Sequence, residues 1–167
     1  MAELLQSERL QPSLLDRLTD DQPLAATESR EQRVLSSRQL KQSVLRDLSW
    51  LLNTSALEHC IDLSEFPFVV RSVLNYGSPV LAGGSLSGVD ALGIAGKLKM
   101  AIGYFEPRIM ADTLKVELIV DENVMSDKAL SFKIEGDLWA QPLPLHLYIR
   151  SDIDLETGEF TVKDLGS

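Results

Sequence analysis

An acid and a base flank a single proline at Glu106, Pro107 and Arg108. Pro107 cannot continue a helix, and it also disfavours helical backbone at Glu106. Because residues two apart in extended backbone point to the same side, we expect the carboxylate and the guanidinium to project together. The pair is either a locally satisfied ion pair that fixes a turn or a rigid, charged docking point for another chain.

Catalysis by carboxylates is the other chemistry that these residues could support. A glycosidase needs two carboxyl groups across a cleft, one of which holds a proton. Glu106 is the obvious candidate, yet the cation of Arg108 favours the carboxylate over the protonated acid. No serine–histidine or cysteine–histidine arrangement stands out as a nucleophile with its base. No motif in the sequence indicates catalysis, and we expect no enzymatic activity.

Metal and phosphate sites have little support in the sequence. His59 and Cys60 are adjacent, and His146 is far away, so no pair has the spacing of metal ligands. The glycine- and serine-rich loop at 83–88 lacks the Gly-Lys-Ser/Thr ending of a phosphate-binding loop. The acidic residues of 152–158 alternate as in a strand, and their glycine comes one place too late for a calcium loop. We therefore expect no metal and no cofactor.

The composition of the chain indicates one acidic domain. The 167 residues include 44% apolar residues, which are enough for a core. The formal net charge is −9, and its excess lies in residues 110–167, which carry 5 basic and 12 acidic side chains. This acidity argues against nucleic acid as a main partner and fits a basic protein surface better.

Targeting signals are missing from the printed sequence. With one cysteine, Cys60, no internal disulfide can form. Glu3 and Glu8 bracket the first short apolar patch, which is unlike a signal peptide. The longest apolar stretch, 91–105, is interrupted by two lysines. We expect a cytoplasmic protein that does not insert into a membrane.

Residues 1–35 form a polar, acidic arm that contains one short predicted helix. Ser13 suits its N-cap, and Asp16 three residues on completes a weak capping box. Its leucines share one face: Leu14, Leu15 and Leu18. A helix this short is marginal alone, so we expect it to pack on the body of the chain or on a partner.

A longer helix is predicted over about 38–53, capped by Ser36 or the next serine. Its apolar stripe consists of Leu40, Val44, Leu48, Leu51 and Leu52. Trp50 lies off this stripe, on the side of Arg46 and Asp47. It either covers a neighbouring segment such as the arm or acts as a contact anchor, because Trp beside Arg is common at binding hot spots.

The remaining pattern predicts two more helices and then strands. We expect a well-buried apolar helix over 66–75, ended by Gly77 with a left-handed backbone, and a helix over 89–105. The expected strands are 113–121, 129–139, 144–153 and 159–163. Helices that precede closely connected strands predict an α+β domain over 36–167. In it, N-terminal helices pack on one face of a C-terminal antiparallel sheet of about four strands.

Four motifs occur in an order that resembles a known family. They are Leu-Leu-Asp-Arg-Leu at 14–18, Val-Leu-Arg-Asp-Leu-Ser-Trp-Leu-Leu-Asn at 44–53, Ser-Val-Leu-Asn-Tyr-Gly at 72–77, and Phe-Glu-Pro-Arg-Ile at 105–109. Over roughly 12–163 the chain resembles the TssE family of bacterial type VI secretion baseplate subunits. That family is similar to a wedge protein of contractile phage tails, once labelled lysozyme-like.

The resemblance implies a structural role. Family members sit in wedge complexes with TssF and TssG, near TssK, in a baseplate docked at the inner face of the cytoplasmic membrane. They are thought to present a sheet edge on which the TssB–TssC sheath begins to grow. An open strand edge can accept a strand of another chain through main-chain hydrogen bonds. A peptidoglycan hydrolase and a wedge protein of a phage tail are the alternatives.

The resemblance also implies which residues serve assembly. The motif residues that we expect to do so are Glu106, Pro107, Arg108, Arg46, Asp47, Trp50, Asn53, Leu14, Leu15, Arg17 and Leu18. Whether Glu106 and Arg108 contact a partner or brace the fold stays open at this point. Docking by this pair predicts that alanine at either position abolishes sheath assembly without unfolding the domain.

Overall fold

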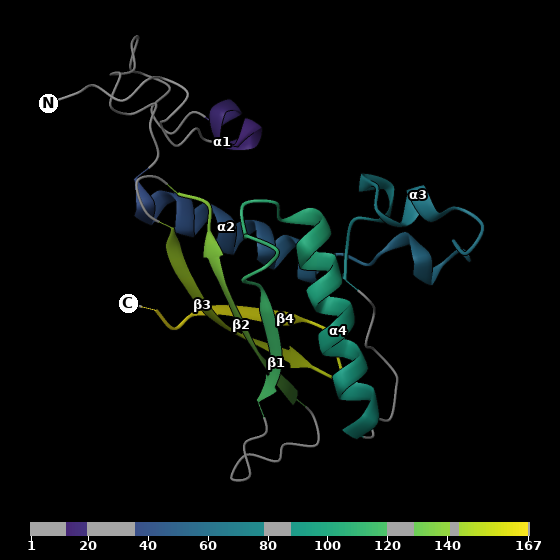
Figure 1. The fold of residues 1–167 in the computed structure, drawn as a ribbon. Coiled ribbons are helices and arrows are strands. Elements are labelled where there is room, and N and C mark those ends of the chain that lie inside the picture. Colours follow the sequence, from purple (N-terminus) through teal and green to yellow (C-terminus); the bar gives the residue numbers. More distant parts are fainter. Residues whose placement is uncertain (1–12, 20–35, 79–87, 120–128, 141–143, 167) are drawn as a thin grey trace, which may run out of the picture.

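The computed structural model describes residues 13–19, 36–78, 88–119, 129–140 and 144–166 (Figure 1). Its helices are α1 (Leu14–Leu18), α2 (Ser37–Leu52), α3 (Pro67–Val70) and α4 (Gly88–Phe105), with 3-10 turns η2 (Leu57–His59) and η3 (Val73–Asn75). Its strands are β1 (Lys115–Ile119), β2 (Ala129–Leu138), β3 (Leu145–Asp154) and β4 (Phe160–Asp164). The predicted α+β class is confirmed. Most of the predicted arm, and all of the loop 83–88 except its last residue, lie outside the described residues.

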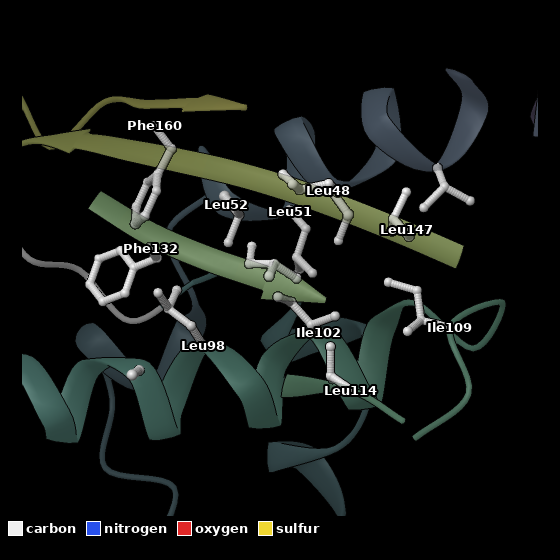
Figure 2. Packing of buried hydrophobic residues seen from close by; sticks show 14 of the residues in the cluster. Leu48, Leu51, Leu52, Leu98, Ile102, Ile109, Leu114, Phe132, Leu147 and Phe160 are labelled. Atoms are coloured by element: carbon white, nitrogen blue, oxygen red, sulfur yellow. The ribbon is translucent and has the colours of Figure 1, made fainter. Parts of the chain in front are cut away.

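The four strands form one antiparallel sheet in the order β1-β2-β3-β4. Side chains alternate across it, and one face is buried. That face contributes Phe132, Ile134, Leu138, Leu147, Ile149, Ile153 and Phe160 to the core. Leu48, Leu51 and Leu52 of α2 meet them together with Leu98 and Ile102 of α4 (Figure 2). Both long helices therefore share a single core with the sheet, α2 beside β4 and α4 beside β1.

The opposite face of the sheet carries charged side chains that pair across and along strands. Lys133 Nζ lies 2.8 Å from Glu135 Oε1 and over the ring of Tyr148. Arg150 Nε lies 2.7 Å from Asp152 Oδ1. Lys133 and Tyr148 come from the neighbouring strands β2 and β3, so this face links strands through polar contacts while the other face links them through the core.

A capping box starts α2. The hydroxyl of Ser36 accepts a hydrogen bond from the Gln39 N–H, and the Gln39 side chain accepts one from the Ser36 N–H. Two of the free N–H groups at this helix end are satisfied in this way. The predicted apolar stripe is buried along its whole length, which confirms the face on which α2 packs.

The prediction of a well-buried helix over 66–75 is wrong. The segment contains only α3 and η3, and the Phe68 side chain is 91% exposed. Side-chain hydrogen bonds replace the helical ones: Asn75 Nδ2 donates to the Val70 carbonyl at 3.1 Å, and the Leu74 N–H donates to the Ser72 hydroxyl. Polar residues of this kind compete with helix by binding nearby backbone, which the apolar pattern did not indicate.

Gly77 closes this segment against the end of α2. Its φ is +147°, a positive value, although the helix over 66–75 that it was expected to cap is not formed. A Cβ at this position would lie 2.5 Å from the carbonyl oxygen of Thr54, so a larger residue would collide with backbone. The close approach allows Ser55 and Ser78 to form a parallel bridge, with the Ser78 hydroxyl donating to the Leu52 carbonyl.

Candidate functional site

The chain leaves α4 and enters the sheet through Glu106, Pro107 and Arg108. The Glu106 N–H still bonds the Ile102 carbonyl at 2.8 Å, as in a helix, and Pro107 then ends the helical pattern. The Arg108 carbonyl accepts a bond from the Trp139 N–H at 2.8 Å, which attaches the turn to the end of β2. These three residues, the junction, are thus held by backbone on both sides.

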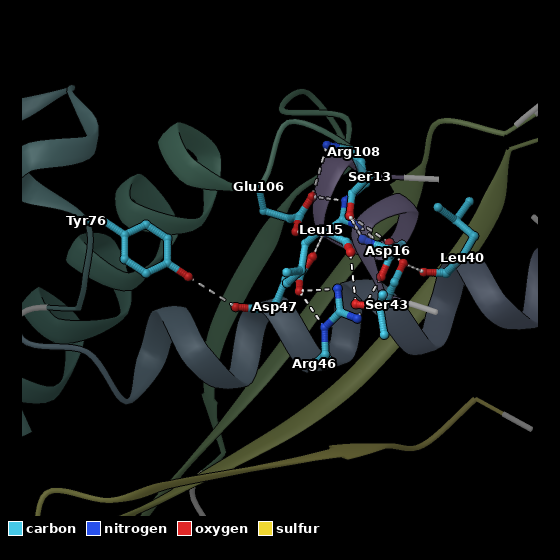
Figure 3. A network of polar contacts seen from close by, with 11 residues as sticks. Ser13, Leu15, Asp16, Leu40, Ser43, Arg46, Asp47, Tyr76, Glu106 and Arg108 are labelled. Atoms are coloured by element: carbon cyan, nitrogen blue, oxygen red, sulfur yellow. Dashed lines mark hydrogen bonds and ion pairs between the residues drawn. The ribbon is translucent and has the colours of Figure 1, made fainter. Parts of the chain in front are cut away.

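The side chains of Glu106 and Arg108 project together, as predicted. Arg108 Nε donates to Glu106 Oε1 at 2.6 Å, and the Arg108 N–H bonds the same oxygen at 3.2 Å. The other Glu106 oxygen accepts from Arg108 Nη2, which also binds Asp47 of α2 (Figure 3). Arg108 Nη1 donates to the Ser43 hydroxyl at 3.2 Å. Glu106 is only 3% exposed, so this carboxylate is fully used inside the chain.

Electrostatics keep the Arg108 guanidinium charged. Burial opposes the charged form of Arg108, but the hydrogen bonds and charges of Glu106 and Asp47 outweigh it and raise the pKa of the guanidinium. A buried charge is tolerated when its partners are equally buried and hydrogen bonded. The Arg108 guanidinium therefore joins the end of α4 to α2, while its backbone carbonyl joins the junction to Trp139, just after β2.

A second arginine continues the network to the N-terminal helix. Arg46 Nε donates to Asp47 Oδ1 at 2.9 Å, and Arg46 Nη1 binds Asp16 Oδ1 of α1 at 2.7 Å. Burial opposes ionisation of Asp16, yet its bonds from Ser13 and Arg46 lower the pKa of the carboxyl. The Arg46 guanidinium also lies 5.0 Å from the ring centroid of Trp50, which is itself exposed.

The leucines of α1 do not pack on the body of the chain. Leu14 and Leu18 are 70% and 74% exposed, and Leu15 is also exposed. The helix is attached through the polar side that carries Asp16, while its leucines face outward. Arg17 lies in α1, with its side chain outside the described residues. The described body of the chain therefore leaves Leu14 and Leu18 largely uncovered, while Leu15 is 45% exposed.

Asn53 lies apart from the charged network, at the other end of α2. Its side-chain amide donates to the Phe160 carbonyl at 3.0 Å and accepts from the Phe160 N–H at 2.9 Å. An amide that both donates and accepts in this way imitates a neighbouring strand at the start of β4. At the far end of β4, Lys41 of α2 lies 2.8 Å from the Asp164 carboxylate.

The network includes two partners that sequence reasoning missed. Asp16 was noticed only as a capping residue, and Ser43 not at all. Ser43 stands four residues before Asp47 on α2, so the helical repeat alone would have put both beside the same neighbour. The partner of that face, Arg108, comes from 61 residues along the chain, and no local pattern indicates such a contact.

The arrangement offers packing and charge rather than an open reactive group. Both oxygens of Glu106 are bonded to Arg108. Within the described ranges, no group of three or more His, Cys, Asp and Glu side chains could hold a metal ion. Among the helices of the described residues, none combines the length and apolar character needed to cross a bilayer.

Comparison with known proteins points to one family. The family model for "Baseplate wedge protein gp25" matches residues 38–143 of the chain. That stretch holds nearly all of α2, together with α3, α4, the junction, β1 and β2, whereas α1, β3 and β4 lie outside it. No curated protein and no solved structure matched. Since the match spans more than half of the chain, this protein belongs to the gp25 family of baseplate wedge proteins.

Proposed function

We propose that this chain is the TssE-type subunit of a bacterial type VI secretion baseplate. It assembles with the wedge subunits TssF and TssG, close to TssK, on the cytoplasmic side of the inner membrane. It then offers a sheet edge as the template on which the TssB–TssC sheath starts. Membership of the wedge family supports the baseplate part of this proposal, and the motif at 14–18 favours the secretion system over a phage tail.

The two edges of the sheet are unequal, and this observation carries the template proposal. Along β4, the Asn53 amide bonds both the N–H and the carbonyl of Phe160, so the start of this edge is covered. β1 is the other outer strand, and no described segment pairs with its outer side (Figure 1). An unpaired edge is a ready site for a strand from another chain.

The backbone groups available on β1 follow from the register. On β2, the backbone N–H and C=O groups of the odd-numbered residues point toward β1. This follows because the Asp137 carbonyl accepts a hydrogen bond from the Met110 N–H on that side. Glu117 and the other odd residues of β1 oppose them. Hydrogen bonds alternate along an edge strand, so the N–H and C=O groups of Val116 and Leu118 point outward. These groups are the proposed docking points for the first sheath strand.

The junction fixes the segment that leads into β1, the proposed template strand. Glu106 and Arg108 fix the chain between α4 and β1 and join it to α2 through Asp47. With Glu106 buried, the bracing role of the pair has more support than direct contact with a partner. Loss of the pair is then expected to impair sheath growth through a loosened β1.

A proline at Leu118 tests the template. Proline removes the outward N–H and is tolerated on an edge strand, whereas Leu118→Ala shortens the same side chain and keeps the N–H. We expect sheath assembly, followed in cells with a fluorescent TssB, to be lost in Leu118→Pro and retained in Leu118→Ala. Normal sheaths in folded Leu118→Pro would contradict templating at β1. Co-purification with TssF and TssG tests the wedge assembly separately.

The protein is also proposed to have no hydrolase activity. A buried carboxylate whose two oxygens bind an arginine is poorly suited to protonate a glycan, and Glu106 is in that position. A zymogram with folded, purified protein is expected to show no cleavage of peptidoglycan. Cleavage that disappears in Glu106→Gln would contradict this.

A further inference from the structure

Residues 57–76, the lobe, lie between α2 and α4 in the sequence and form a small projection on the side of α4 away from most of α2 (Figure 1). Buried Asn75 holds it together by accepting from the Glu58 N–H at 2.9 Å and donating to the Val70 carbonyl. Tyr76 attaches it to α4, with its ring centroid 5.4 Å from that of Phe105. The lobe therefore has a defined conformation although it adds little to the main core.

The lobe exposes more large apolar side chains than its size explains. They are Ile61, Phe66, Phe68, Val73 and Leu74, and all are more than half exposed. Single exposed apolar residues are ordinary, but a concentration of them in one short segment marks an interaction site. Buried Asn75 and its bonds keep the backbone of this segment ordered, so the exposure is not the result of a frayed helix.

The charges of the lobe indicate the kind of partner. Glu58, Asp62 and Glu65 are exposed there, and Arg71 is the only arginine or lysine in the same residues. The Arg71 guanidinium lies 5.5 Å from the ring centroid of Tyr104 on α4, so this cation faces the body of the chain. An exposed apolar segment that also carries three exposed acids is complementary to apolar side chains flanked by basic ones.

We infer that the lobe is a second docking surface, distinct from the β1 edge, and that it receives an amphipathic helix of another protein whose apolar face is flanked by lysine or arginine. Aromatic side chains such as Phe66 and Phe68 supply the apolar contact, and the exposed acids of the lobe select the basic flank. The inference depends on the proposed baseplate role in one respect only, which is the identity of the protein that carries this helix.

The experiment titrates the full-length, isotope-labelled chain with two synthetic peptides and follows backbone amide resonances. One peptide carries leucine at helical spacing with lysine elsewhere, and the other replaces every lysine by glutamate. The lysine peptide is expected to bind at least tenfold more tightly, with shifts concentrated in 57–76. Phe68→Ser and Leu74→Ser are each expected to weaken it at least tenfold. Leu165→Ser, an exposed leucine beyond β4, is the matched control and should change it less than twofold.

Three results of the peptide titrations would overturn the inference. They are equal binding of both peptides, shifts concentrated on the charged sheet face instead of the lobe, and an equal loss in Leu165→Ser. A dimer of the chain that Phe68→Ser abolishes would also overturn it, by making a second copy the occupant. Circular dichroism of each variant excludes unfolding as the cause. The outcome is separate from the proposed function, because the Leu118→Pro sheath assay does not depend on the lobe.

Discussion

The junction and the lobe lie on either side of α4 in the sequence. They differ in what they bury, because the junction buries charged side chains whereas the lobe exposes apolar ones. At the junction, Glu106 and Arg108 are charged, yet each finds its partners inside the chain. In the lobe, Phe68 and Leu74 are apolar, yet both face outward. The motif that looks most like a binding site is therefore self-satisfied, and the segment that looks like core is the one with contacts left to make.

This difference separates two kinds of contribution to assembly. A buried ion pair stabilises only while both partners are present, since one charge left alone is costly. An exposed apolar side chain costs the folded monomer little when it is removed, and its effect is seen in binding. Variants of the junction should thus lower the stability of the monomer, whereas variants of the lobe should leave it nearly unchanged.

The largest expected effect is at Glu106. Glu106→Ala leaves Arg108 half-buried with Asp47 as its remaining carboxylate, and we expect a loss of about 3–5 kcal/mol in the free energy of unfolding. Urea denaturation followed by circular dichroism measures it. The surface control is Glu117→Ala, whose carboxylate lies 3.8 Å from Lys133, with an expected change within about 0.5 kcal/mol. Equal stability of the two variants would break the comparison.

The base of the lobe should behave like the junction and not like the lobe's tip. Gly77→Ala places a Cβ against the Thr54 carbonyl at a φ of +147°, so we expect a loss of about 1–3 kcal/mol or more from strain and collision. Phe68→Ser, in contrast, should leave the thermal midpoint almost unchanged. If Gly77→Ala were neutral, the lobe could not be held where its contacts place it.

Asn53 sharpens the contrast between the two sheet edges. Asn53→Ala removes both bonds to the Phe160 backbone, and we expect a loss of about 1–2 kcal/mol. Asn53→Asp keeps the acceptor but turns a carboxylate oxygen toward the carbonyls of Phe160 and Ser49, so its loss should be at least as large. Hydrogen exchange should accelerate at the Phe160 amide in Asn53→Ala. Unchanged exchange there would mean that this edge is protected by something other than Asn53.

The fold was largely predictable because its strongest signals are periodic. The stripe from Leu40 to Leu52 and the alternation around Phe132 and Leu147 each report a single buried face, and both are confirmed. The segment 66–75 misled the same reasoning, because its apolar residues have helical spacing but Phe66, Val73 and Leu74 are exposed and none of the others is fully buried. Periodicity shows which residues are apolar. It does not show whether the surface that covers them belongs to this chain or to another.

The candidate site was only partly predictable. The pairing of Glu106 with Arg108 follows from a two-residue spacing, and it was expected. Their link to Asp47 and onward to Arg46 and Asp16 requires the tertiary fold, since it joins residues 61 and 30 positions apart. The sequence left open whether the pair docks or braces, and the burial of Glu106 favours bracing.

The smallest expected effect concerns α1, where the charged network reaches the surface. The pKa of Asp16 is lowered in the folded chain, so its bond to Arg46 stabilises the docked helix at neutral pH. That contribution is lost as the pH falls below the ordinary value of 3.8 and through the folded-state pKa. As a partly exposed pair it is expected to be worth no more than about 1 kcal/mol.

Trp50 offers a probe for this step, because the Arg46 guanidinium lies over its ring. In a Trp139→Phe background, Trp50 is the only tryptophan, and its fluorescence should change in acid as Arg46 is released from Asp16. Asp16→Asn should remove the acid step and resemble the low-pH state at neutral pH. An acid step that persisted in Asp16→Asn would mean that another carboxyl, such as Asp47, controls Arg46, and α1 would then be held independently of the junction network.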